Sequence, residues 1–423
     1  MTDDSHRSRP PSVGGAPTDR GARPSPAAFR LFVTARAVSR FGDGLVPVAL
    51  SAGLVLTGHG ISSVSYALGA WTAAFGGFVL LGGVLTDRFS PRRTMVFADV
   101  LRVLAAGLLA VAFGHGDPAL WLVYALSAVG GLGAALFQPG IAGTIAAIAT
   151  DVQRANAVVR SAESLMTIAG PGVAALLVAA VGAAGLYAVD AASFGLSALC
   201  LYLTREGPQP RGHGKSLLRD LVEGWREFRR RRWLWAVIAI WTGYSLTVLG
   251  PMVPLQNVLL TQTHGATALG VIMAVFGAGS AAGGLLALRT RPRRPLASGT
   301  VALSGVSVHL LALSMDAPLP VLGVAVFAGG AGLMYWIVMW STALQTHIPP
   351  HAISRLSAYE MAGSVLPLAG GRVLAGPADA WLSARAALLL CALLNCAVMA
   401  ALFAVPAIRR LPNADGGSAR YQR

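Results

Sequence analysis

Charged residues are scarce in this sequence of 423 residues. They make up 12% of the chain, whereas a typical soluble domain carries about 25%. Hydrophobic residues account for 55%, and the mean hydropathy is +0.62. The shortage of charge excludes an ordinary soluble domain, and the long apolar runs place the chain among membrane proteins.

Cysteine is nearly absent as well. Cys200, Cys391 and Cys396 all fall inside apolar runs, and the last two are not spaced for a disulfide or a CxxC site. We therefore expect these side chains to serve in packing.

Motifs for cofactor chemistry are missing too. No HExxH sequence or cluster with metal-ligand spacing occurs. Gly214-Lys215-Ser216 resembles part of a phosphate-binding loop, but Gln209 stands where that loop needs a glycine. The sequence predicts no metal, no cofactor, no ATP-driven pump and no enzyme. A receptor would need a soluble signalling domain, for which the tails are too short.

Basic residues are in excess, with a net charge of +15. They lie in short segments between apolar runs, which is the pattern of membrane topology and not of nucleic-acid binding. Residues 1–30 are rich in Pro, Ser and Arg and lack the apolar stretch of a signal peptide, which predicts a disordered cytoplasmic tail.

Apolar runs long enough to cross a bilayer, roughly 20 residues each, recur throughout the chain. We predict twelve such helices, at 32–57, 62–86, 94–114, 118–140, 159–182, 184–204, 233–259, 266–289, 296–315, 318–343, 354–375 and 382–406.

The distribution of arginine predicts the orientation of these helices. Both tails, the second, fourth and eighth loops and the central loop are basic, whereas the first, third, fifth, seventh and ninth loops hold no Lys or Arg. Arg355, Arg372 and Arg385, near the last two loops, blur this pattern without reversing it. The positive-inside rule then predicts an inner-membrane protein with both termini cytoplasmic.

The longest loop divides the chain into two six-helix halves, 31–204 and 233–408, followed by a disordered tail at 409–423. Residues 205–232 join the halves, and their apolar side chains recur at helical spacing among arginines. This pattern predicts an amphipathic helix on the inner leaflet, held by anionic lipid, or alternatively a helix that docks a partner.

The halves repeat one another at a constant offset of 201 residues. Gly82 matches Gly283, Phe75 matches Phe276, and Arg93 matches Arg294. The same offset pairs Gly42 with Gly243 in the first and seventh helices. A parallel repeat of this kind is typical of transporters whose two halves rock about a central site.

The loop after the second helix carries Gly83, then Asp87-Arg88, then Arg92-Arg93. In this motif and its placement the chain resembles the major facilitator superfamily. The resemblance implies an all-α fold of twelve transmembrane helices in two parallel six-helix repeats, a monomer, and a loop that latches the halves together in one state. We expect Gly83 to allow close helix packing.

Further short sequences resemble the exporters of drugs and siderophores in that family, such as enterobactin and macrolide exporters. Gly170-Pro171-Gly172 resembles the Gly-Pro element of the exporters' fifth helix, where proline kinks the helix and glycine allows tight packing. The segments around Gly42, Asp99 and Asp190 are also similar to that group.

Charged side chains inside apolar runs are costly and need a reason. Asp43 lies near the middle of the first helix, with Arg40 and Arg36 on the same helical face. Because burial favours the neutral form of a carboxyl group, alternating hydration would let Asp43 bind and release a proton. A fixed ion pair with Arg40 is the alternative.

Other carboxylates are weaker candidates for proton coupling. Asp190 is placed near the outer end of the sixth helix, and Asp99 is interpreted as a local partner of Arg102. Glu163 and Glu360 are interpreted as carboxylates at the start of the fifth and eleventh helices.

Aromatic side chains mark a candidate substrate site, because the family builds its cavity from the first, fourth, seventh and tenth helices. These residues are Trp241, Tyr244, Tyr335, Trp336 and Trp340. Aromatic faces bind flat or cationic amphiphiles. Packing or contact with lipid is the alternative for each.

Together these features predict a secondary transporter that exports a small amphipathic compound (a drug, antibiotic or siderophore) by proton antiport. The alternative is an uptake symporter or an uncoupled facilitator for a small metabolite. The expected partners are the substrate, protons and membrane lipid, and not nucleic acid.

Overall fold

The computed structural model describes residues 26–149, 151–204, 232–290, 292–347 and 350–411. All regular structure in these ranges is helical. The predicted amphipathic helix, residues 1–25 of the predicted tail and most of the C-terminal tail lie outside the described residues.

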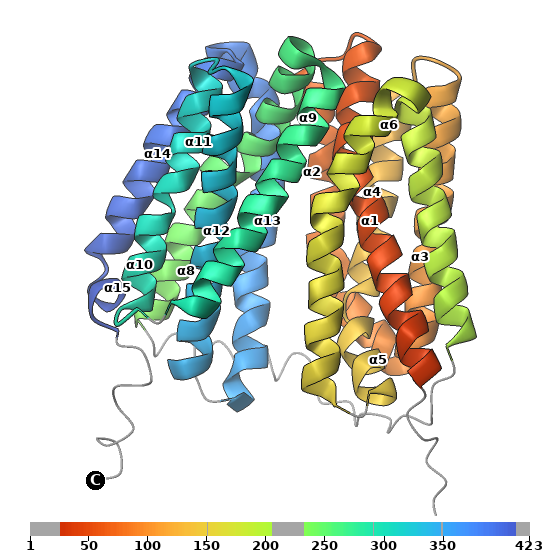
Figure 1. Cartoon of the computed structure of the whole chain (residues 1–423), viewed down its shortest axis with the longest axis horizontal. Helices are drawn as coiled ribbons and strands as arrows, with labels where there is room; N and C mark the ends of the chain where they lie inside the picture. The colour runs from red at the N-terminus through yellow and green to blue at the C-terminus, as the bar shows by residue number, and fades with distance from the viewer. Residues whose placement is uncertain (1–25, 150, 205–231, 291, 348–349, 412–423) are drawn as a thin grey trace, which may run out of the picture.

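The helices form two bundles that stand side by side, coloured red to yellow and green to blue in Figure 1. The N-terminal bundle comprises α1 (Pro26–Leu56), α2 (Ile61–Phe89), α3 (Pro91–Gly114), α4 (Leu120–Phe137), α5 (Gly140–Ile148) and α6 (Val152–Leu203). The C-terminal bundle comprises α8 (Arg232–Tyr244), a π-helical turn η1 (Ser245–Leu249), α9 (Gly250–Arg289), α10 (Pro295–Ala302), α11 (Ser304–Ser314), α12 (Leu319–His347), α13 (Pro350–Leu382), α14 (Ala384–Ala404) and α15 (Pro406–Arg410).

The described residues include 8 helices that are long and apolar enough to cross a membrane. Two of them bend sharply at glycines with positive φ, α6 at Gly182 (φ 62°) and α9 at Gly265 (φ 84°). Glycine suits this conformation because it has no Cβ. Each bend falls between two predicted spans. Every predicted span is helical, so the all-α polytopic fold is confirmed, while the number of crossings stays a prediction.

Several helices begin earlier than predicted, which moves two carboxylates into helix interiors. Asp151 caps α6, where its side chain accepts a hydrogen bond from the Arg154 amide at 2.9 Å. Glu163 therefore lies about three turns inside α6. Similarly, α13 begins at Pro350, well before Glu360. The interpretation of Glu163 and Glu360 as residues at helix starts is wrong, because hydropathy underestimates the polar first turns.

Other helix bounds also differ from the predicted ones. The helix α1 begins at Pro26, so the last residues of the predicted tail are helical. The helix of the predicted fourth span, α4, ends at Phe137, and a short helix that was not predicted, α5, follows from Gly140. The predicted ninth span divides into α10 and α11.

The internal repeat is visible in helix packing. A Cβ at Gly82 of α2 would lie 2.4 Å from the Ala135 carbonyl oxygen of α4, and one at Gly283 of α9 would lie 2.1 Å from the Ala331 carbonyl oxygen of α12. Matched glycines therefore set matched close crossings in the two halves.

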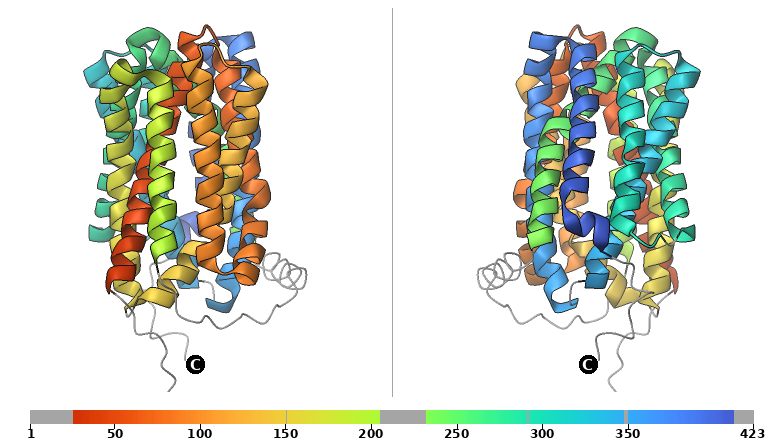
Figure 2. Two further views of the ribbon diagram at one scale, coloured as in Figure 1. Left: turned by 90° about the vertical axis from the view of Figure 1, so that its right-hand side faces the viewer. Right: turned by 90° about the vertical axis from the view of Figure 1, so that its left-hand side faces the viewer.

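The two halves meet through α2 with α13 and through α6 with α9. A Cβ at Gly376 would lie 2.7 Å from Ser62 Oγ, and one at Gly270 would lie 2.6 Å from the Ala175 Cβ. Ser62 belongs to the first turn of α2, and in Figure 1 α2 begins at the upper end of the molecule, where the ribbons of the two bundles lie closest. The start of α1 and the short α15 lie at the lower end, and the side views in Figure 2 show long helices running between these ends.

Candidate functional site

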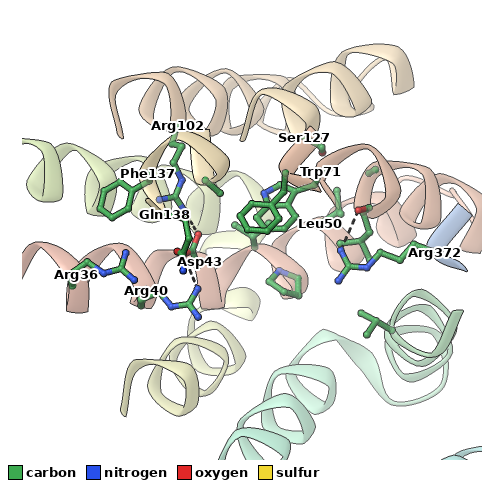
Figure 3. Close-up of a pocket in the computed structure, with 17 residues that line it drawn as sticks. Arg36, Arg40, Asp43, Leu50, Trp71, Arg102, Ser127, Phe137, Gln138 and Arg372 are labelled. Carbon is green, nitrogen blue, oxygen red and sulfur yellow. Dashed lines mark hydrogen bonds and ion pairs between the residues drawn. The ribbon is translucent and has the colours of Figure 1, made fainter. Parts of the chain in front are cut away.

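A cavity of about 400 Å³ lies between the halves. Its wall is formed mainly by α1, α2 and α4, with Arg102 from α3, Val253 from α9 and Arg372 from α13 (Figure 3). The N-terminal half thus supplies most of the lining, and nearly all of its charge.

Asp43 lies on the cavity wall between two arginines. Its Oδ2 is 3.4 Å from Arg40 Nη1, as the helical spacing predicts. Its Oδ1 accepts a shorter hydrogen bond from Arg102 on α3. The Asp43 side chain retains 26% of its exposure, whereas that of Arg102 retains 5%. The predicted Asp43–Arg40 pair is therefore present, but Arg102 is the closer partner.

Arg102 is the centre of a buried polar cluster. Its Nη1 donates to Ser39 Oγ at 3.1 Å and lies 3.5 Å from Asp99 Oδ1, and its guanidinium lies 3.7 Å over the Phe194 ring. The predicted local pair of Asp99 and Arg102 is therefore present, but Arg102 also joins α3 to α1. The sequence does contain a signal for this contact, because an arginine within the apolar run of α3 needs a partner.

Arg36 does not pair with Asp43. It donates to Glu163 of α6, with Nε 3.0 Å from Oε1, and its guanidinium lies over the Phe137 ring. Arg160 is 3.7 Å from the other oxygen of Glu163. This buried ion pair fixes α1 against α6 below Asp43, while Arg36 still lines the cavity.

Asp190 belongs to the surroundings of Asp43. A Cβ at Gly42 would lie 2.5 Å from Asp190 Oδ1, so the carboxylate occupies the space beside α1 that glycine leaves open. Asp43, Arg102 and Asp190 line an adjoining cavity of about 50 Å³. Asp190 therefore lies level with Asp43, about two turns after the bend at Gly182. Its Oδ1 is buried without a hydrogen-bond partner among the described residues.

The motif between α2 and α3 is a tight turn. Ser90, with φ 87°, is the single residue between the two helices. Arg92 donates to the carbonyl oxygen of Thr204 at 2.7 Å, just after the end of α6. Arg88 lies over the Phe89 ring at 5.9 Å, and Arg93 is exposed.

The expected packing role of Gly83 is wrong. A Cβ there would meet no described atom within 4 Å, whereas the neighbouring Gly82 meets α4. One residue turns a helix by about 100°, so a shift of one position exchanges the packed face for an open one. The side chain of Asp87 lies outside the described residues, and the latch between the halves stays a prediction.

The Gly170-Pro171-Gly172 motif lies where α6 crosses α1. A Cβ at Gly170 would be 2.9 Å from the Gly44 Cα and 2.8 Å from the Phe41 carbonyl oxygen. A Cβ at Gly172 would be 3.6 Å from the Ala274 Cβ of the other half. The motif therefore connects the backbone beside Asp43 with the interface between the halves.

All five predicted aromatic residues belong to the C-terminal half, and four of them lie close together. The rings of Trp241 and Trp336 stack with centroids 5.7 Å apart, and Tyr244 is 5.0 Å from Trp241. Trp241, Trp336 and Trp340 line a second cavity of about 170 Å³. Tyr335 lies elsewhere, with its hydroxyl 3.1 Å from Thr290 Oγ1.

Two aromatic residues of the larger cavity come from α2 and were not predicted. Trp71 and Phe75 stack with centroids 5.5 Å apart, and both line that cavity. Arg372 was also missed as a site residue, because it was placed beside a loop. The helix α13 continues ten residues beyond it to Leu382, and the guanidinium faces the cavity.

The described part of the chain holds no group of three or more His, Cys, Asp or Glu residues placed to bind a metal ion. The site consists instead of a cavity, an aromatic wall and paired charges.

Comparison with known proteins agrees with this architecture. The sequence model of the Major Facilitator Superfamily matches residues 32–371. The chain belongs to that superfamily of membrane transporters. It is 22% identical to Macrolide efflux protein A of Enterococcus faecalis over 68% of this chain and 91% of that protein. It is 25% identical to the enterobactin exporter EntS of Shigella flexneri over 82% of this chain and 84% of that protein.

The fold is shared with solved transporters. The nucleoside transporter NupG superposes with a TM-score of 0.74 at 11% identity, covering 90% of this chain and 99% of that one. The resemblance to the exporter branch is thus confirmed at low identity, and the protein is a multi-pass membrane transporter.

Proposed function

We propose that this transporter exports a small amphipathic compound from the cytoplasm in exchange for protons, and that Asp43 carries the proton. The observation that supports this most strongly is the position of Asp43, on the cavity wall and shared between arginines of α1 and α3. The names of the two similar exporters support the direction of transport.

Protonation of Asp43 changes its contacts in a defined way. The charged carboxylate attracts Arg102 and Arg40, and the neutral acid loses most of this attraction. The contacts that hold α1 to α3 are weakened, and Arg102 is left with Asp99 and Ser39. Binding of a proton thereby shifts the balance between two packings of α1.

A movement of α1 reaches the other half through α6. Gly44, next to Asp43, touches Gly170, and two residues further Gly172 faces Ala274 of α9. Because these crossings lack side chains that could absorb a displacement, a shift of α1 is transmitted to the interface. The proton site and the rocking interface are thus coupled.

The distribution of arginine supports a location in the inner membrane with both termini cytoplasmic, and membership of the family supports a monomer. The ribbons of the two halves lie closest at the end away from the start of α1 (Figure 1), which is the outer end in the proposed topology. Substrate then enters the cavity from the cytoplasm.

Inside-out vesicles test the function. Vesicles carrying the protein are energised to an acid interior, and cationic dyes, macrolides and siderophores are added one at a time. We expect one class of compound to collapse the pH gradient, and Asp43→Asn to abolish the collapse. The exposed Asp117 provides the matched control, since Asp117→Asn lies in a loop and should leave it unchanged.

Gradient collapse that persists in folded Asp43→Asn would overturn the assignment of the proton site. No collapse by any compound would contradict proton-coupled export of these classes and favour a facilitator.

A further inference from the structure

The charge on the wall of the larger cavity is unbalanced. Four arginines and one carboxylate, Asp43, line it. Arg36 is paired with Glu163, and both Arg40 and Arg102 are paired with Asp43. Arg372 is the arginine of this lining with no carboxylate partner among the described residues.

Arg372 contacts only neutral groups in the described structure. Its Nη1 donates to the Leu68 carbonyl oxygen at 3.2 Å and to the hydroxyl of Thr72. Its Nε is buried without a hydrogen-bond partner. Hydrogen bonds to neutral oxygens do not balance a cation held away from water, so this guanidinium is poised to receive an anion.

The aromatic pair lies beside this cation. Trp71 precedes Thr72 in α2, and it stacks on Phe75 while both line the cavity. Figure 3 shows Trp71 between Arg372 on one side and Asp43 with Arg40 on the other. A flat ring placed against Trp71 would thus bring an attached oxyanion to Arg372 while remaining clear of the Asp43 cluster.

We propose that the transported compound is an aromatic organic acid, whose carboxylate or comparable oxyanion is bound by Arg372. A guanidinium matches the two oxygens of a carboxylate in a planar, bidentate arrangement. This inference rests on the proposed transport role of the cavity, and it does not depend on protonation of Asp43.

Arg372 also joins the two halves, because Leu68 and Thr72 belong to α2 and Arg372 to α13. A purely structural bridge would explain its contacts without a ligand. Thr72→Val removes the hydroxyl and keeps the cation, so this variant distinguishes the bridge from the anion site.

Equilibrium binding to purified protein, measured without a proton gradient, tests the proposal. The probes are matched pairs of acid and methyl ester: 2-naphthoic acid, 1-pyrenebutyric acid and norfloxacin, each with its ester. We expect at least one acid to bind about tenfold or more tightly than its ester, a ratio within the range of one charge-assisted hydrogen bond. Arg372→Gln should remove this preference, Arg372→Lys should retain part of it, and Thr72→Val should preserve it.

The proposal is overturned if no acid binds more tightly than its ester, or if the preference survives in folded Arg372→Gln. Equal losses in Thr72→Val and Arg372→Gln would assign Arg372 to the structural bridge instead. Unchanged ester binding shows that a variant is folded. Because binding is measured without a proton gradient, the result does not depend on whether the protein exchanges its substrate for protons.

Discussion

The two halves of the transporter place different chemistry at matching positions. At the offset of 201 residues, Asp43 corresponds to Tyr244, Arg40 to Trp241, and Asp190 to Cys391. In the N-terminal half these positions hold the Asp43–Arg40 pair and, beside it, the Asp190 carboxyl group. In the C-terminal half they hold two aromatic rings in contact and a thiol.

The backbone crossings, by contrast, are kept in both halves. Gly170 touches α1 beside Asp43, and its counterpart Gly371 touches η1, where a Cβ would lie 2.3 Å from the Leu246 carbonyl oxygen. Glycines therefore preserve the packing of the repeat, while the matched side chains are charged in one half and aromatic or apolar in the other.

Loss of Arg102 should have the largest effect on stability. Arg102→Gln removes the closer of the two cations beside Asp43 and the cation beside Asp99, and breaking a buried pair costs about 3–5 kcal/mol. We expect this loss in the free energy of unfolding, measured by denaturation in detergent, and partial recovery when Asp43→Asn is added. The exposed Arg93→Gln serves as control. An equally large loss in Arg102→Gln alone and in the double variant with Asp43→Asn would show that Arg102 stabilises the fold independently of Asp43.

Introducing charge into the C-terminal half should be nearly as costly. Cys391→Asp places a carboxylate at the position that matches Asp190, where Cys391 is buried and its Sγ donates to the Thr247 carbonyl oxygen. We expect the free energy of unfolding to fall by about 2.5–3.5 kcal/mol, because no arginine cluster surrounds this site in the described part of the chain. Asp190→Asn in the other half should lower the stability less. If Cys391→Asp is as stable as the wild type, the two halves do not differ in their tolerance of a buried carboxylate.

Adding a methyl group at the matched crossings should have a similar, moderate effect in both halves. Gly170→Ala and Gly371→Ala each bring a Cβ against backbone atoms, and overpacking of this kind costs about 1–3 kcal/mol. Thermal unfolding would measure the loss, with Gly83→Ala as the control. A severe effect in one half only would show that the crossings are not equivalent.

Removal of the Tyr244 hydroxyl should have the smallest effect. This oxygen is buried and has no hydrogen-bond partner among the described residues. Tyr244→Phe therefore removes an unsatisfied polar group, and we expect the protein to be unchanged or stabilised by up to about 1 kcal/mol. Transport lost in this variant would indicate that the hydroxyl binds substrate or a proton.

Local patterns in the sequence predicted much of the architecture. Hydropathy located the long helical segments but not the short α5, and the offset between halves identified the repeat. Arg40 was found as a partner of Asp43 because the two are three residues apart on one helix. Helix ends were less accurate, since a polar first turn such as that of α6 does not differ from a loop in hydropathy.

Contacts between distant helices could not be predicted in this way. Arg102 lies 59 residues from Asp43, and Arg372 lies 300 residues from Thr72. Such pairs depend on the rotation of each helix about its axis, and a shift of one residue was enough to misplace Gly83. The position of Trp71 in the larger cavity could not be predicted for the same reason, because only packing decides which side of α2 faces the other half.

The most direct test of the account is proton-driven accumulation in reconstituted proteoliposomes. Substrate uptake is measured with an imposed pH gradient and, separately, as exchange between equal pools without one. We predict that Asp43→Asn retains exchange and loses accumulation, because the cavity remains while the proton carrier is gone. Accumulation that persists at wild-type levels in Asp43→Asn would contradict the central role of this carboxylate.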